Sequence, residues 1–115
     1  MQLHKWADIN EERLNATATR QMIHGATMTI AKLRLSKGAV VPMHSHHNEQ
    51  ITTVESGSLL FITPSERIVV RAGESLCLPP NLPHSVETLE DSVAVDVFSP
   101  VREDWVRGDD SYLRR

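Results

Sequence analysis

Three histidines, His44, His46 and His47, lie within four positions of the chain. The residues before them, 38–42, are typical of a strand, and side chains two positions apart on a strand point to the same face. His44 and His46 can therefore converge on one ion, whereas His47 points the other way. Neutral imidazole is the commonest protein ligand for a transition metal, so this spacing indicates a candidate metal site.

Two further side chains extend this pattern. Gln50 lies four positions after His46, where the next strand is predicted to begin, and His84 follows a proline-rich segment at the start of another strand. A single histidine on a strand is more often an ordinary structural side chain than a metal ligand. The close pair His44 and His46 favours the metal interpretation, and the full pattern favours it further.

The chain around these residues has the pattern of many short strands. From residue 17 to about 98, segments rich in Val, Ile, Leu and Thr alternate with Gly, Pro, Asn and Ser. The stretch 27–35 alternates polar and apolar side chains, which predicts a half-buried strand. Further strands are predicted at 18–24, 39–44, 50–55, 58–62, 67–71, 75–78, 84–88 and 92–98. Many short strands at regular spacing predict an all-β antiparallel sandwich or barrel.

The two ends of the chain lack this strand pattern. The first 15 or so residues are polar and predict a loose lead-in with one short helical turn. The charged C-terminal tail, residues 99–115, predicts a short helix around 102–107. No repeat, low-complexity stretch or linker divides the sequence, so we expect a single domain over residues 1–115.

The composition excludes several classes of protein. The chain has 115 residues, a net charge of −3, 40% apolar residues and 23% charged residues, a globular balance that is neither disordered nor basic enough for nucleic acid. No apolar run is long enough to cross a bilayer, and the first residues have no signal-peptide core. One cysteine, Cys77, excludes an internal disulfide and suits a reducing compartment. We therefore expect a cytoplasmic protein with no nucleic-acid and no membrane partner.

The first half of the histidine pattern resembles a known motif. Its fixed positions are Gly38-x5-His44-x-His46-x3-Gln50-x6-Gly57. This spacing resembles the first motif of the cupin superfamily, which normally has glutamate at the position of Gln50.

The second half of the pattern resembles the second cupin motif. Its fixed positions are Gly73-x5-Pro79-x-Asn81-x2-His84, with Asn81 where glycine is usual. The resemblance to small single-domain RmlC-like cupins implies a jelly-roll β-barrel over about residues 17–98. It also implies one divalent transition metal ion in the mouth of the barrel. The ligands that it implies are His44, His46, Gln50 and His84.

The glutamine has a chemical consequence for such an ion. Gln50 would bind through a neutral amide oxygen, so three imidazoles and one amide leave the charge of a divalent ion uncompensated. An ion of this kind is a better Lewis acid towards a bound anion or enolate oxygen. This ligand set favours proton transfer or isomerisation over oxygen chemistry. It does not select among Ni, Zn, Mn, Fe and Co, all of which accept such ligands.

The last predicted strand, 92–98, carries one charged side chain in an apolar setting. Alternation places Asp96 on the same face as Ala94 and Phe98, opposite three valines. A carboxylate in an apolar strand is costly unless it is paired, solvated or functional. Near a divalent ion or an arginine it can exchange protons with a substrate. The alternative is an edge-strand aspartate that faces water.

The residues that follow carry a second resemblance. The pattern Asp96-x-Phe98-x-Pro100-x-Arg102-Glu103-Asp104-Trp105 closely resembles the C-terminal segment of pectin-degradation cupins of the KdgF type. These proteins convert 4,5-unsaturated monouronates to linear keto forms. The resemblance implies Asp96 as the proton-transfer residue, Phe98 as a pocket wall and Arg102 as the group that binds the sugar carboxylate. From the residues alone, Arg102 can equally be a surface cation paired with Glu103 or Asp104.

One more arginine is a candidate for substrate binding. Arg20 directly precedes residues 21–25 of a strand that small cupins place across the barrel mouth, where it would offer a second anion contact. A solvated surface arginine is the alternative.

These features support a metal-dependent cupin enzyme that isomerises or tautomerises an unsaturated uronate. A non-catalytic cupin that binds a sugar acid or a metal is an alternative, and a metal-dependent dioxygenase is another. The partner would be a small sugar acid, and the resemblance to small cupins implies a homodimer.

Overall fold

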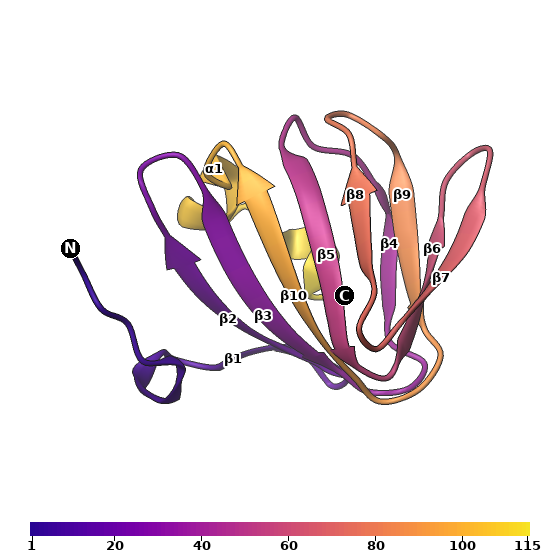
Figure 1. The fold of residues 1–115 in the computed structure, drawn as a ribbon, viewed down its shortest axis with the longest axis horizontal. Coiled ribbons are helices and arrows are strands. Elements are labelled where there is room, and N and C mark those ends of the chain that lie inside the picture. Colours follow the sequence, from indigo (N-terminus) through magenta and orange to yellow (C-terminus); the bar gives the residue numbers. More distant parts are fainter.

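Ten strands form two antiparallel sheets in the computed structural model, which describes residues 1–115 (Figure 1). The larger sheet contains, in spatial order, β1 (Glu12–Asn15), β2 (Ala18–His24), β3 (Thr29–Leu35), β10 (Ser92–Ser99), β5 (Glu49–Ser56) and β8 (Ser75–Leu78). The smaller sheet contains β4 (Val40–His44), β9 (His84–Thr88), β6 (Ser58–Ile62) and β7 (Arg67–Arg71). Three short helices complete the chain: η1 (Trp6–Asp8), α1 (Glu103–Val106) and η2 (Ser111–Leu113). None of the helices is long and apolar enough to span a membrane.

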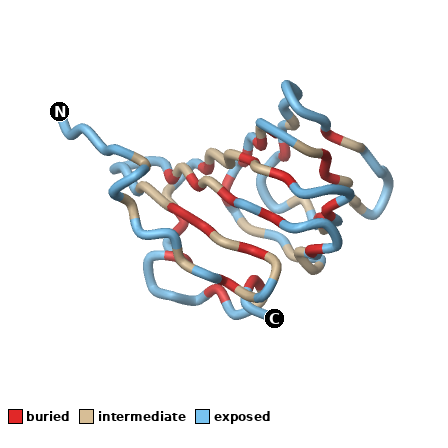
Figure 2. Tube along the Cα trace, turned by 90° about the horizontal axis from the view of Figure 1, so that it is seen from below, coloured by how far each residue is buried: buried red, intermediate tan, exposed pale blue.

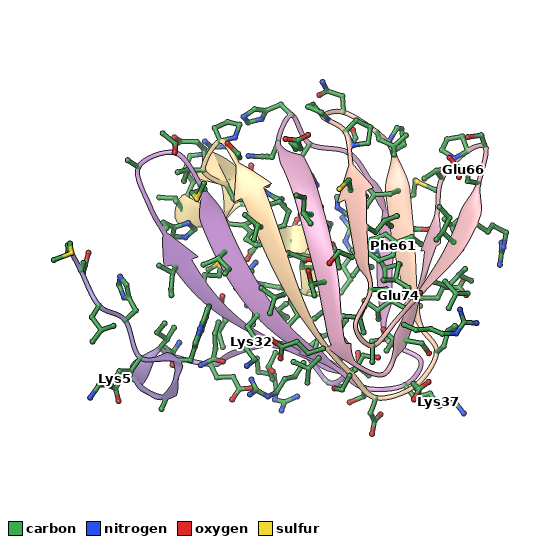
Figure 3. The ribbon with its side chains drawn as sticks, viewed as in Figure 1. Lys5, Lys32, Lys37, Phe61, Glu66 and Glu74 are labelled. Atoms are coloured by element: carbon green, nitrogen blue, oxygen red, sulfur yellow. The ribbon has the colours of Figure 1, made fainter.

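Strand alternation builds a core between the two sheets. On β3, Ala31, Leu33 and Leu35 are buried, whereas Lys32 and Arg34 between them are more exposed. Along the strands of Figure 2, buried positions likewise alternate with more exposed ones. The smaller sheet contributes Phe61 of β6, which Figure 3 labels among the side chains between the sheets. Burying one face of each sheet is what makes these short strands stable.

The predicted all-β jelly-roll architecture is confirmed, with one correction to its closure. All nine predicted strands are present, and all of their boundaries agree within two residues. The two sheets share no backbone ladder, so they form an open sandwich and not a hydrogen-bonded closed barrel. On one side the C-terminal segment covers the opening, because buried Leu113 shares a small cavity with Leu14 of β1 and Val41 of β4.

The N-terminal lead-in is more ordered than the sequence predicts. The expected helical turn is η1, but β1 lies in the part that was expected to be loose. It pairs with β2, and the carboxylate of Glu12 accepts a hydrogen bond from the Arg20 Nε at 2.8 Å. These partners supply order that the local sequence does not indicate.

The loops gather at two opposite ends of the sandwich. Figure 3 labels Lys37 in a loop at one end and Glu66 in the β6–β7 turn at the other. The end that holds Glu66 also holds the end of β4 and the starts of β5 and β9 (Figure 1). His44, Gln50 and His84 therefore lie at the same end of the molecule.

Gly57, in the tight turn between β5 and β6, is expected to tolerate no side chain. It has φ +84°, and an added Cβ would overlap the side chain of Ser92 and the carbonyl of Asp91. We expect Gly57→Ala to lower the free energy of unfolding by about 3 kcal/mol, because the strain of a left-handed backbone at alanine and the steric overlap of its Cβ both destabilise the folded state. Gly38→Ala is the matched control, since Gly38 has φ +90° with no neighbour within 4 Å. It should lose only about 1–2 kcal/mol. Equal losses in urea unfolding would contradict the steric account.

Candidate metal centre

Three histidine side chains converge at one end of the sandwich. His44 ends β4, His84 begins β9, and the two are direct partners across the ladder that joins these strands. His46 lies in the loop that follows β4, and its ring centroid is 5.7 Å from that of His44 and 5.2 Å from that of His84. One nitrogen from each ring lies within 4.8 Å of the others. Three imidazoles at this separation can bind a single ion.

Backbone carbonyls fix the orientation of all three rings. The Nδ1 atom of His44 donates to the Pro42 carbonyl at 2.8 Å, and that of His84 donates to the Leu82 carbonyl at 2.8 Å. The Nδ1 atom of His46 donates to the carbonyl of Asn48 at 3.0 Å. A carbonyl can only accept, so each Nδ1 carries the proton and each Nε2 keeps a lone pair. Metal-binding histidines in proteins are oriented in this way.

A fourth neutral ligand atom faces the same point. Gln50 is buried, and its Oε1 atom lies 3.0 Å from Nε2 of His46. Its Nε2 donates to the Thr52 hydroxyl at 2.9 Å, which directs the amide oxygen towards the histidines. With the His46 proton on Nδ1, Oε1 and Nε2 are both lone-pair acceptors. Two acceptors in contact repel each other unless a cation lies between them, so these residues fit a bound metal ion.

The environment keeps the imidazoles uncharged. Burial lowers the pKa of His44 to about 4 and that of His46 to about 4, and the positive charge of Arg102 acts in the same direction on both. Burial also lowers the pKa of His84. Neutral imidazole is the form that binds metal. The site therefore has its ligands in the binding form at neutral pH.

Asn81 occupies the position where the second motif usually has glycine, and its backbone explains both residue types. Asn81 has φ +67°, the left-handed region that glycine and asparagine adopt most readily. In this conformation its backbone N–H donates to the carbonyl of His46 at 2.8 Å. Asparagine can therefore replace the usual glycine here without losing the hydrogen bond that holds the loop of His46 in place.

A carboxyl group lies beyond the neutral ligands. The Oδ1 atom of Asp96 accepts a hydrogen bond from the hydroxyl of Thr52 at 2.6 Å. Burial raises the pKa of Asp96 to about 6, although the Thr52 hydrogen bond and the charge of Arg102 oppose this shift. A carboxyl group with this pKa can hold or release a proton near neutral pH. Asp96 thus faces the inside of the sandwich, and not water as in the edge-strand alternative.

Arg102 is buried beside the same space. Its Nε and Nη2 atoms donate to the two carboxylate oxygens of Asp104 at 3.0 and 2.8 Å. Its guanidinium carbon lies 4.6 Å from the ring centroid of Phe98 and 4.0 Å from that of Trp105, and both are cation–π distances. Nη2 also donates to the Tyr112 hydroxyl at 2.8 Å. Nη1 forms no hydrogen bond within the chain, so it is available to a ligand.

The structure brings most of the predicted site residues to one inner cavity of about 50 Å³. The predicted residues that line it are His44, Gln50, His84, Asp96, Phe98 and Arg102. His46 is not among the lining residues, but its ring is in edge-on contact with that of Phe98, with 5.6 Å between ring centroids. Thr52 and Tyr112 also line the cavity, and sequence reasoning gave neither of them a role.

Arg20 is not in this cavity. Its guanidinium is almost fully buried, and its Nη2 atom lies 2.7 Å from the carboxylate of Glu12 and 2.6 Å from that of Asp110. It also lies over the ring of Trp105, 4.5 Å from the centroid. These contacts occupy Nη2 and the face of the guanidinium with partners inside the chain.

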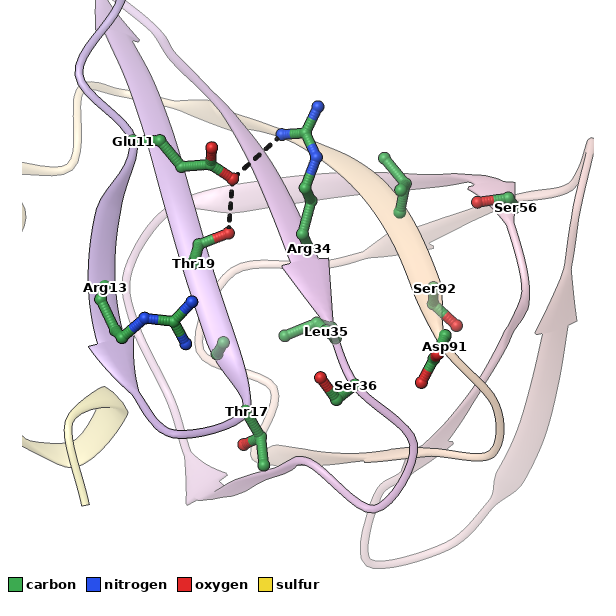
Figure 4. Close-up of a pocket in the computed structure, with 12 residues that line it drawn as sticks. Glu11, Arg13, Thr17, Thr19, Arg34, Leu35, Ser36, Ser56, Asp91 and Ser92 are labelled. Carbon is green, nitrogen blue, oxygen red and sulfur yellow. Dashed lines mark hydrogen bonds and ion pairs between the residues drawn. The ribbon is translucent and has the colours of Figure 1, made fainter.

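A larger cavity of about 380 Å³ lies at the opposite end of the sandwich (Figure 4). Its lining is mostly polar, and Asp91 there accepts a hydrogen bond from the backbone N–H of Lys37 at 2.8 Å. Glu11 accepts hydrogen bonds from Arg34 at 3.4 Å and from Thr19 at 2.8 Å, and Arg13 donates to backbone carbonyls. It contains no histidine, so the smaller cavity is the one equipped for chemistry.

Comparison with known proteins gives a consistent result. Residues 31–99 match the family model described as "Cupin domain". The chain is 33% identical over 76 residues to "Pectin degradation protein KdgF" of Dickeya dadantii (strain 3937), which covers 64% of this chain and 69% of that protein.

Solved structures share the fold. KdgF from a Halomonas species has a TM-score of 0.79 at 24% identity, covering 86% of this chain and 94% of that one. An RmlC-like cupin from Shewanella frigidimarina NCIMB 400 has a TM-score of 0.84 at 25% identity, covering 91% and 96%. Oxalate decarboxylase from B. subtilis has a TM-score of 0.75 at 21% identity, but this chain matches only 29% of it.

Thr52 is expected to set the affinity for metal through Gln50. Thr52→Val keeps the shape of the side chain but removes the hydroxyl that holds the amide, so the amide oxygen loses its fixed direction. We expect Zn²⁺ affinity, measured by competition with a chromophoric chelator, to fall about 10- to 100-fold. Thr52→Ser keeps the hydroxyl and should stay close to the wild type. Equal affinities for the valine variant and the wild type would contradict this role.

The metal-free protein is expected to lose stability as the pH falls from 6.5 to 4. In this window the unfolded chain binds more protons than the folded one at His44 and His46, because their folded-state pKa values are about 4. Below pH 6 Asp96 has the opposite effect on stability, because its raised pKa makes the folded chain bind its proton more readily than the unfolded chain does. The contribution of two histidines to the free energy of unfolding is larger than that of one carboxyl group, so stability still falls. Thermal unfolding at pH 7, 5.5 and 4.5 measures the trend. His44→Gln combined with His46→Gln should flatten it, and a midpoint that rises towards pH 4.5 would contradict it.

Proposed function

The chain belongs to the cupin family, and from this premise we propose that it is a metal-dependent enzyme that converts 4,5-unsaturated monouronates to linear keto sugar acids. The observation that carries the proposal is the position of Asp96, a half-buried carboxyl group that lines the inner cavity beside the neutral ligand cluster and has a raised pKa. The similarity to a pectin degradation protein supports this substrate class. The three-histidine cluster supports a divalent ion as cofactor, with Ni, Zn, Mn, Fe and Co as candidates.

The metal ligands in this proposal are His44, His46, Gln50 and His84. A divalent ion bound there would supply Lewis acidity towards the oxygens of the sugar acid. The ligands add no negative charge, because all four are neutral. The protein therefore leaves the ion able to attract an anionic substrate.

In this proposal Arg102 binds the substrate and Asp96 transfers the proton. Nη1 of Arg102 is free to bind the substrate carboxylate, while Asp104 holds the rest of the guanidinium in place. Thr52 holds Oδ1 of Asp96, which leaves Oδ2 to exchange a proton with the substrate as the enol form becomes the ketone. Phe98 forms part of the wall of the same cavity, and its ring lies against the guanidinium of Arg102.

The size of the cavity limits how the substrate would bind. About 50 Å³ has room for a carboxylate or a pair of oxygens, but not for a whole sugar ring. His44 and His46 are half-buried, whereas His84 is buried. We therefore place the reacting oxygens and the carboxylate inside the cavity and the rest of the sugar at the exposed edge of His44 and His46.

The assembly and the location of the protein are part of the proposal. We propose a homodimer that works in the cytoplasm on a free sugar acid, without nucleic-acid or membrane partners. Light scattering coupled to gel filtration measures the assembly directly.

Asp96→Asn is expected to abolish most turnover while metal stays bound. Removing the proton-transfer group should lower kcat about 10²- to 10⁴-fold. The assay is the loss of ultraviolet absorbance as the conjugated double bond of the unsaturated uronate disappears, with metal content measured on the same samples. Asp109→Asn, at a largely exposed carboxylate, is the matched control and should keep the wild-type rate.

Three outcomes would contradict parts of this account. If the metal-loaded wild type leaves the unsaturated uronate to decay at its spontaneous rate, the proposed substrate is wrong. If Asp96→Asn keeps the full rate, the proton-transfer role of Asp96 is wrong. If turnover requires iron and oxygen, and zinc or nickel does not support it, the dioxygenase alternative replaces the proposal.

A further inference from the structure

The C-terminal segment 110–115 reaches into the metal site from outside the part of the chain that matches the cupin domain. That match ends at residue 99. In η2, the ring of Tyr112 lies against the imidazole of His44, with 4.8 Å between ring centroids and 36° between the ring planes. Tyr112 also lines the inner cavity together with Asp96 and Arg102. Its side chain is therefore adjacent both to a metal ligand and to the proposed substrate-binding groups.

Ion pairs and hydrogen bonds hold this segment in place. The buried carboxylate of Asp110 accepts hydrogen bonds from Nη2 of Arg20 at 2.6 Å and from Nε of Arg114 at 3.0 Å. The side-chain amide of Asn15 donates to the carbonyl of Leu113 at 3.0 Å, and Leu113 itself is buried in the core. Tyr112 lies between these anchors, so its position is set by the folded structure.

The hydroxyl of Tyr112 has an unused donor. Its oxygen receives hydrogen bonds from Nη2 of Arg102 at 2.8 Å and from Nε1 of Trp105 at 3.3 Å. Guanidinium and indole N–H groups are donors only, so the tyrosine oxygen acts as the acceptor in both contacts. The O–H of Tyr112 then has no acceptor within the chain, and Tyr112 belongs to the wall of the inner cavity.

We propose that Tyr112 is a further substrate-binding residue, whose O–H donates to the carboxylate of the sugar acid beside Nη1 of Arg102. The proposal deepens the proposed function and rests on it. Nη2 of Arg102 donates a hydrogen bond to the tyrosine oxygen. The two unused donors, Nη1 of Arg102 and the O–H of Tyr112, therefore belong to two side chains that are hydrogen-bonded to each other. Two adjacent donors match the two oxygens of one carboxylate. Tyr112 thus contacts the substrate and also positions Arg102.

Tyr112→Phe tests the proposal, because it keeps the ring against His44 and removes only the hydroxyl. A hydrogen bond to a charged group contributes enough that its loss should raise KM for the unsaturated uronate about tenfold or more. We expect kcat to change less than KM, and Zn²⁺ affinity to stay at the wild-type value. Ser111→Ala, at an exposed neighbour in the same helical turn, is the control and should change none of the three.

A binding measurement separates this inference from the proposed reaction. Isothermal titration of the zinc-loaded protein with D-galacturonate and with neutral D-galactose reports carboxylate recognition without turnover. We expect the wild type to bind galacturonate more tightly than galactose. We expect Tyr112→Phe to bind galacturonate about tenfold more weakly than the wild type does. An inactive wild type that shows this pattern overturns the proposed reaction but supports the role of Tyr112. A wild type with no preference for galacturonate, or a phenylalanine variant with wild-type KM and affinity, overturns the inference about Tyr112.

Discussion

Three hydrogen bonds from imidazole N–H groups to backbone carbonyls are the constraint on which this site depends. They place the proton of His44, His46 and His84 on Nδ1, and so they turn three Nε2 lone pairs towards one point. Each carbonyl belongs to a residue two positions from the histidine that it holds. The strand ends and loops that carry the ligands thus also orient them, and no charged side chain is needed for this.

The cavity combines a neutral side with a charged side. The neutral side consists of His44, His84 and Gln50, and the charged side consists of Asp96 and Arg102. Thr52 joins the two, because it accepts a hydrogen bond from Gln50 and donates one to Asp96. The orientation of the amide ligand is therefore linked to the carboxyl group that would exchange protons. Both lie on the large sheet, whose ladder fixes their separation.

The sequence predicts the parts of this arrangement that depend on local spacing. Strand boundaries follow from alternation, and the positions of the histidines follow from motif spacing. The remaining parts depend on contacts between distant residues. Arg20 forms a hydrogen bond with Asp110 across 90 positions of the chain, a contact that no local pattern indicates. For Arg102, the sequence allows either a surface cation paired with an acidic neighbour or a group that binds the substrate. In the structure, Arg102 pairs with Asp104 and is also buried. The open edge of the sandwich and the place of Tyr112 likewise depend on how the tail packs.

A crystal structure of the metal-loaded protein, with anomalous scattering recorded at the absorption edge of zinc, tests the central claim most directly. The account predicts one ion bound by Nε2 of His44, His46 and His84, with the amide oxygen of Gln50 as a further ligand, at about 2.0–2.2 Å from each. An ion bound through Nδ1, or no anomalous peak between the three imidazoles at saturating zinc, would contradict it.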